Sequence, residues 1–438
     1  MAARVGRFAA AGYRRRPYDR VAAEVDALGS DSAPGGLQAP SATRRIFMGY
    51  AAYALLVEPL LSILRLTGVF NSSVLIQYVN VIVATCLVAS HRRVRLLRTH
   101  YQALLVLVAV QASVLGLLAF PDIPWRDYFS HGAQLGIAFI MLGTGAIVGS
   151  ALSKQFWHRL AMFSLAGGVA ALALTLAQHS AGNVARYELP AYGFLIAWSK
   201  GLADRHVGLV LAAGALIALS AKRGVMVAAV GALGVALAFA WQQGASPRSA
   251  SRRAVRGLAV SATVVMLFVL LTPAGESLKP PEVMARAVEL SRERIDFTLD
   301  GLSGGKTDVN VISSGRVAEV EAALDTLDPI TVLTGRGAGA QVELPHAQEQ
   351  VQFLHLSPLS LTMVYGLPFA LATYGFIALQ IVRGLRGRED DPLSRMLAIY
   401  ASAALVHSFF AYSLFIDLFL FFSVGCLHER YGHHREGV

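Results

Sequence analysis

Apolar runs of nearly bilayer-spanning length recur along this chain of 438 residues and limit what it can fold into. An α-helix needs about 20 mainly apolar residues to cross the hydrocarbon core of a membrane. Only 15% of the residues are charged, compared with about 25% in soluble domains, and the mean hydropathy is +0.52. The sequence therefore predicts an all-α, polytopic integral membrane protein.

Basic residues between the apolar runs predict the topology. Arginines cluster in residues 91–98, 248–256 and 383–388, as expected of cytoplasmic loops. Alternation about these loops gives about twelve transmembrane helices and one large outer loop that contains helices. The predicted parts are a disordered basic cytoplasmic tail at 1–45, about nine transmembrane helices in 46–272, the outer loop at 273–352, the C-terminal transmembrane helices at 353–427 and a cytoplasmic tail at 428–438.

A cationic pair, Lys222 and Arg223, stands in a short turn between two apolar runs, residues 207–219 and 225–241. The predicted topology brings this turn to the outer side, opposite to the strongly basic loops. Charge held so close to the hydrocarbon core is expensive and marks a functional site by default. Two other interpretations stay open: the pair snorkels to the outer surface, or a missed span places the turn inside.

Two helices are predicted in the outer loop. Residues 280–302 form the first. The second begins after Ser313 and Ser314, which are favourable N-cap residues, and continues to Leu327. Arg316 lies in its first turn, where free N–H groups and the helix dipole favour phosphate. The guanidinium adds a planar fork of donors that matches phosphate oxygens.

Two further stretches of the loop carry candidate polar residues. Residues 334–339 form a mobile Gly-rich turn around Arg336. The turn lacks the Lys-Ser/Thr ending of a P-loop, and a plain turn is a commoner interpretation than a phosphate cradle. His346 stands in a polar run and is expected to be solvated. His355 opens an apolar run at the membrane boundary, where Pro358 fits the first turn of a helix that begins close to His355.

Nothing in the sequence indicates a metal or a cofactor. The two cysteines, Cys86 and Cys426, lie inside apolar runs and are expected to be core residues. The outer loop has no Asp-x-Asp motif and no His/Cys cluster suited to zinc. We attribute the net charge of +10 to basic residues in the loops, which set the membrane topology, and no nucleic-acid partner is expected.

Four motifs occur in a characteristic order and spacing. They are Ser220-Ala221-Lys222-Arg223-Gly224, Ser314-Gly315-Arg316, Gly335-Arg336-Gly337-Ala338-Gly339, and His355 with Tyr365-Gly366-Leu367-Pro368. From about Leu160 to its end, the chain resembles the O-antigen polymerase and O-antigen ligase family of bacterial membrane glycosyltransferases. The family places a histidine eleven residues before a glycine, as His355 and Gly366 are placed here. The chain departs from the pattern at Leu356 and Phe369, which weakens the ligase interpretation more than the polymerase one.

The resemblance implies a reaction on the periplasmic face of the bacterial inner (cytoplasmic) membrane, which makes residues 273–352 a periplasmic loop. It implies a metal-independent, inverting transfer of a glycan from undecaprenyl pyrophosphate. A polymerase passes the glycan to the sugar end of another lipid-linked repeat of an O-antigen or exopolysaccharide. A ligase passes it to a lipid A core, and a protein O-oligosaccharyltransferase passes it to a protein. The lipid bilayer, the lipid-linked glycan, a chain-length regulator and a flippase are the partners that the resemblance implies.

The resemblance also assigns roles to residues. Arg223 and Arg316 bind the pyrophosphate and stabilise its developing charge, and Lys222 and Arg336 assist. His355 either accepts the proton of the acceptor hydroxyl or positions a substrate by hydrogen bonding. Glu319 and Glu349 are reserve candidates for the base. A transporter of lipid-linked glycans is the second class considered, although the two halves of the chain show no internal repeat of the kind common in transporters.

Overall fold

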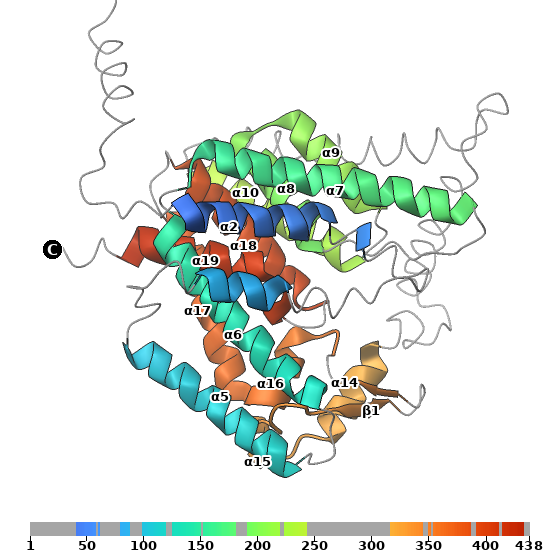
Figure 1. The fold of residues 1–438 in the computed structure, drawn as a ribbon, viewed down its shortest axis with the longest axis vertical. Helices are drawn as coiled ribbons and strands as arrows, with labels where there is room; N and C mark the ends of the chain where they lie inside the picture. Colours follow the sequence, from blue (N-terminus) through green and yellow to red (C-terminus); the bar gives the residue numbers. More distant parts are fainter. Residues whose placement is uncertain are drawn as a thin grey trace, which may run out of the picture. The chain divides into compact units, whose positions relative to one another are not determined.

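The computed structural model describes thirteen segments of the chain, which are residues 41–57, 60–61, 79–87, 99–119, 125–149, 152–180, 191–219, 223–242, 316–344, 349–351, 354–386, 391–410 and 414–432. These residues are mostly helical, which confirms the all-α class (Figure 1). The elements are α2 (Ser41–Ala52), the π-helical turn η1 (Tyr53–Val57), α5 (Thr99–Ala119), α6 (Trp125–Val148), α7 (Lys154–Ser180), α8 (Ala191–Asp204), α9 (Val207–Leu219), α10 (Arg223–Gln242), α14 (Arg316–Asp325), α15 (Pro329–Thr334), β1 (Val342–Leu344), β2 (Glu349–Val351), α16 (Ser357–Tyr365), α17 (Leu367–Arg386), α18 (Pro392–His407), the 3-10 turn η3 (Leu414–Ile416) and α19 (Leu418–Gly432).

Helix boundaries follow the apolar runs closely in the middle of the chain. The run at 207–219 is α9, and the run at 225–241 lies within α10. Two departures are clear. Helix α2 begins at Ser41, inside the tail that we expected to be disordered up to residue 45. The region predicted to be the outer loop contains a two-stranded antiparallel sheet, in which Val342 pairs with Val351, whereas the other described elements are helical.

The part of the chain that the structure describes contains one helix, α17, that is both long and apolar enough to cross a membrane. Shorter apolar helical stretches cover Leu107–Ala119, Val207–Ile217 and Gly224–Ala240. The predicted helix at 280–302 and the apolar run at 258–271 lie outside the described residues. The figure of about twelve spans therefore stays a prediction.

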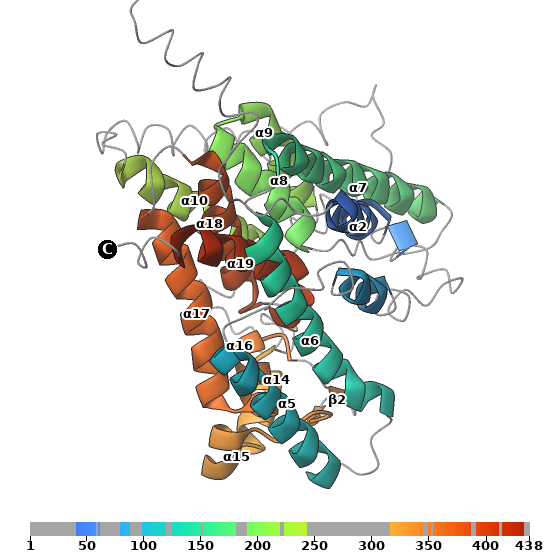
Figure 2. The ribbon, with the colours of Figure 1, turned by 60° about the vertical axis from the view of Figure 1, so that its left-hand side comes forward.

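Helix α18 lies at the centre of the helical core and contacts α8, α10, α17 and α19 (Figures 1 and 2). Its residues from Met396 to Ala404 are almost all buried. Beside it, α19 packs backbone to backbone against α6. A Cβ on Gly145 would overlap the Phe422 carbonyl, and a Cβ on Gly425 would overlap the Leu142 carbonyl. Small residues allow this close approach of apolar helices.

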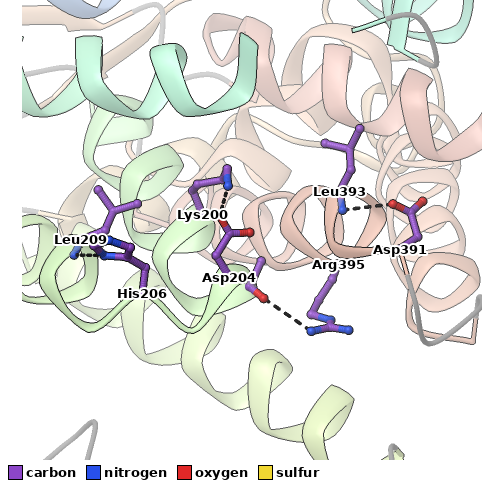
Figure 3. A network of polar contacts seen from close by, with 8 residues as sticks. Lys200, Asp204, His206, Leu209, Asp391, Leu393 and Arg395 are labelled. Atoms are coloured by element: carbon purple, nitrogen blue, oxygen red, sulfur yellow. Dashed lines mark hydrogen bonds and ion pairs between the residues drawn. The ribbon is translucent and has the colours of Figure 1, made fainter. Parts of the chain in front are cut away.

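Polar contacts join the helix ends at the start of α18 (Figure 3). Asp391 caps α18 by accepting the Leu393 N–H at 3.1 Å, and it forms an ion pair with Arg430 near the end of α19. Arg395 donates to the carbonyl of Ala203, near the end of α8, at 3.4 Å. The end of α8, the start of α18 and the end of α19 therefore lie together.

The opposite end of α18 gathers a different set of segments. The Ser357 N–H, at the start of α16, donates to the Ser408 carbonyl at 3.0 Å. A Cβ on Gly224, at the start of α10, would touch Phe410 and lie 3.5 Å from the His407 ring. The residues that follow His355 and Arg223 thus meet at the same short segment, residues 407–410.

Candidate functional site

His355 and Glu319 form a close polar pair at the start of α16. Nδ1 of His355 lies 2.7 Å from Oε1 and 3.0 Å from Oε2 of Glu319. The backbone N–H of His355 also donates to Oε2, at 3.0 Å. One carboxylate therefore holds both the backbone and the ring of the histidine.

The contact fixes the tautomer of the neutral imidazole. An ionised carboxylate only accepts hydrogen bonds, so Nδ1 of His355 must carry a proton to donate to Glu319. In the neutral ring the lone pair is then on Nε2. The His355 side chain is 26% exposed, whereas that of Glu319 is 9% exposed. A buried acceptor thus orients a partly exposed ring whose Nε2 can accept a proton.

Local sequence explains how the two residues reach each other. Glu319 lies in the first turn of α14, and Ala323, one turn further on, is fully buried and anchors the helix. His355 precedes α16, which begins with Ser357 and has Pro358 in its first turn. The helix predicted to begin close to His355 is therefore confirmed.

Burial and hydrogen bonding act in opposite directions on the pKa of Glu319. Burial of the carboxylate raises this pKa. Hydrogen bonds from the side chain and backbone of His355, together with the charges of His355 and Arg316, lower it by more, so the net pKa lies below its ordinary value. Glu319 therefore stays ionised at neutral pH and keeps its role as acceptor.

Arg316 belongs to the same site. It is the first residue of α14, three positions before Glu319, and residues at this spacing share a helix face. Its positive charge lowers the pKa of Glu319. The structure thus brings together Arg316, Glu319 and His355. The sequence singled out all three, although it gave Glu319 only a reserve role as a base.

Backbone hydrogen bonds hold the Gly-rich turn around Arg336 in place. The N–H groups of Arg336 and Gly337 donate to the carbonyls of Met363 and Val364 near the end of α16, at 2.6 and 3.1 Å. The N–H of Ala338 donates to Ala112 of α5 at 2.8 Å. We expected a mobile turn, but these bonds hold it against two helices.

Glycine is required where this turn meets the α16–α17 junction. Gly335 has φ 75° and ψ 169°, and Gly366 has φ 89° and ψ 155°, which is a region that only glycine adopts readily. A Cβ on Gly335 would overlap the Val364 carbonyl, and one on Gly366 would overlap the Leu333 carbonyl. Two motifs noted separately in the sequence are therefore the two halves of one backbone contact.

The backbone of Arg336 lies at the opposite end of α16 from His355. Its backbone is bonded to Met363, near the end of α16, whereas His355 precedes the start of that helix. Six residues separate Ser357, the first residue of α16, from Met363, which is about 9 Å along the helix axis. Its guanidinium donates to the Gln341 carbonyl at 3.3 Å, and burial lowers its pKa, although an arginine remains protonated.

The remaining predicted residues are placed only in part. Arg223 begins α10, and its backbone lies at the end of the core that also holds the start of α16, but its side chain is outside the described part. Glu349 begins β2, and only its backbone is described. Lys222 and His346 lie outside the described residues, as do Ser313 and Ser314.

The described residues contain no group of three or more His, Cys, Asp and Glu side chains arranged to hold a metal ion. No family model, curated protein or solved structure matches the chain. The resemblance to the polymerase and ligase family accordingly depends on the motif residues themselves.

Proposed function

We propose that this protein is a membrane glycosyltransferase that polymerises a bacterial surface polysaccharide, an O-antigen or an exopolysaccharide. The donor is a glycan on undecaprenyl pyrophosphate, and the acceptor is the sugar end of another lipid-linked repeat. The observation that carries the proposal is the Glu319–His355 pair, with Nδ1 only 2.7 Å from the carboxylate. It supplies an oriented base to a motif set that resembles this family.

In the proposed step, Nε2 of His355 accepts the proton of the acceptor hydroxyl. The hydroxyl oxygen attacks the anomeric carbon of the donor sugar from the face opposite the pyrophosphate. The new carbon–oxygen bond forms as the bond to the phosphate oxygen breaks, and the electron pair leaves with undecaprenyl pyrophosphate. The configuration at the anomeric carbon is therefore inverted, and the step needs no metal or cofactor.

The arginines act on the leaving group. Pyrophosphate is a good leaving group whose developing charge is stabilised by fixed cations. We assign this role to Arg223 and Arg316, with Lys222 and Arg336 in assistance. Among these cations, Arg316 has the best support for a place in the site, because its positive charge lowers the pKa of Glu319.

The proposed setting is the bacterial inner membrane, crossed by about twelve helices, with the site on the periplasmic face. A chain-length regulator and a flippase are the partners expected with such an enzyme. Support for the orientation comes from the two ends of α18. The segments next to the predicted cytoplasmic loops, at Ala203 and Arg430, meet at one end, and the starts of α10 and α16 meet at the other.

The test is glycan profiling of a strain that lacks this gene and carries a plasmid copy. His355→Ala and Arg223→Ala are compared with wild type and with His346→Ala, a matched loop histidine, at equal membrane abundance. We expect His355→Ala and Arg223→Ala to lose the polymer ladder and leave single repeats on the acceptor, while His346→Ala keeps the ladder.

Two outcomes would redirect the assignment. Long polymer that accumulates on the lipid carrier would identify a ligase, which passes preformed chains to lipid A core. Repeats that fail to reach the periplasmic leaflet would identify a transporter. A full ladder from both variants would exclude a catalytic role for His355 and Arg223.

A further inference from the structure

Helix α15 (Pro329–Thr334) turns two large apolar side chains outward. Ile330 is 72% exposed and Leu333 is 62% exposed. The helix is nevertheless well formed, because Asp328 accepts the N–H groups of Ile330 and Thr331 at 2.8 Å each and closes a capping box. Apolar side chains exposed on an ordered helix mark a contact surface when they continue into a larger apolar patch.

Exposed apolar residues also occur on the helices that contact α15. Gln111 of α5 donates to the Thr334 carbonyl at 3.0 Å, and α15 also contacts α16 and α17 (Figure 2). On these neighbours, Leu118 of α5 is 76% exposed and Leu371 of α17 is 63% exposed. The outward faces of α5, α15 and α17 therefore present apolar side chains in the same part of the molecule.

The position of the contact along α5 indicates how deep α15 lies. Exposed apolar residues of α5 flank Gln111 on both sides, with Leu107 at 62% and Leu118 at 76% exposure. Leu118 is seven residues beyond Gln111, which is about 10 Å along the helix axis. A lipid layer that covers the exposed face of α5 up to Leu118 also reaches the depth of α15.

We propose that α15 is an interfacial helix seated in the outer leaflet of the bilayer, with Ile330 and Leu333 among the acyl chains. This inference rests on the membrane setting of the proposed function. Helices that bury an apolar face lie in this way at the boundary between headgroups and acyl chains. The Gly335–Gly366 contact ties α15 to the end of α16.

The test measures the depth of single spin labels in the full-length protein, reconstituted in vesicles of phosphatidylethanolamine and phosphatidylglycerol. The native cysteines are first replaced as Cys86→Ser and Cys426→Ala. Labels are then attached at Ile330→Cys, at Leu118→Cys as a lipid-facing reference, and at Glu343→Cys, an exposed polar position in β1. Relaxation by oxygen, which partitions into acyl chains, is compared with relaxation by a water-soluble nickel chelate.

We expect the oxygen-to-nickel ratio at Ile330→Cys to approach that at Leu118→Cys and to exceed that at Glu343→Cys severalfold. Leu333→Cys should behave as Ile330→Cys does and guards against a local effect of one label. A water-like ratio at Ile330→Cys beside a lipid-like ratio at Leu118→Cys would overturn the inference and leave the proposed reaction intact. Water-like ratios at both would remove the membrane setting as well.

A label shielded from both reagents and immobile in its spectrum would also contradict the inference, since a protein partner or a second copy would then cover α15. None of these readouts depends on transferase activity. Failure of this inference and failure of the proposed function are therefore separate results.

Discussion

Replacing Glu319 with Gln tests the candidate site most directly. The substitution keeps the size of the side chain and removes its charge. Glutamine has one oxygen and one NH2 group, so only one of its two terminal atoms can accept a hydrogen bond. In the wild type both carboxylate oxygens lie near Nδ1 of His355, at 2.7 and 3.0 Å, and Oε2 also accepts the backbone N–H of His355 at 3.0 Å. If the amide oxygen keeps the backbone contact, its NH2 group faces Nδ1 and forces that nitrogen to accept. The proton then moves to Nε2, which loses its lone pair.

The expected size of the effect follows from this loss. General base catalysis contributes about 10²- to 10⁴-fold to a rate, so kcat of Glu319→Gln should fall within this range. KM for the lipid-linked donor should change little, because neither Arg316 nor Arg223 is altered. Glu319→Ala should lose as much activity, and it should lose about 1–3 kcal/mol of stability because the His355 N–H groups lose their acceptor.

The assay is polymer formation by purified protein in vesicles that contain the lipid-linked repeat. Glu321→Gln is the matched control, because Glu321 is exposed and lies on the same helix. The double variant Glu319→Gln/His355→Ala should be no slower than His355→Ala, since residues that act as one unit are not additive. A Glu319→Gln enzyme with at least half the wild-type kcat would refute the orienting role of the carboxylate.

Two further predictions concern stability. Gly366→Ala should lower the melting temperature, because the φ of 89° at Gly366 costs other residues about 1–3 kcal/mol. The control, Gly375→Ala, has open space around it and should leave the melting temperature unchanged. Equal melting temperatures for the two variants would contradict the close contact between Gly335 and Gly366. Burial raises the pKa of Asp391, but hydrogen bonds from Ser394 and the charge of Arg430 hold this pKa below the ordinary value of 3.8. The Asp391–Arg430 ion pair therefore stabilises the fold above pH 3.8 and loses its effect as the pH falls through the lowered pKa. Arg430→Gln should therefore destabilise the protein most at pH near 7 and progressively less as the pH falls below 3.8 and through the lowered pKa of Asp391, as thermal melts over that range would show. A difference independent of pH would contradict the ion pair.

Most of the fold that could be predicted followed from the positions and lengths of the apolar runs. The run at 207–219 is bounded by Arg205 and His206 before it and Lys222 after it, so both ends of α9 were visible in the sequence. The region from 353 to 382 was expected to contain a helix and a span, and it forms α16 and α17. The break at Gly366 follows from a contact with Gly335, and no local pattern contains that information.

The candidate site was predictable residue by residue but not as a geometry. Arg316 and His355 stood out because of their chemistry and their surroundings. Glu319 is 36 residues from His355, and its carboxylate is an acceptor only because α14 docks beside the start of α16. A pairing of that kind depends on tertiary packing, so the sequence offered Glu319 merely as another acid. The same reason explains the Gly-rich turn, which looks mobile until Ala112 and Met363 bind it.

The charges of the site indicate that different residues bind the hydroxyl group and the anion. Glu319 is buried and ionised, so it repels a pyrophosphate that approaches the same atoms. Arg316, three residues earlier on the helix, offsets that charge. When the His355 ring is neutral, its Nδ1 donates to the carboxylate and its Nε2 carries the lone pair, which suits a hydroxyl group and does not suit an anion. In the proposed reaction we therefore expect the acceptor sugar at His355 and the pyrophosphate on the arginine side, where the start of α10 brings the backbone of Arg223 to the same end of the core.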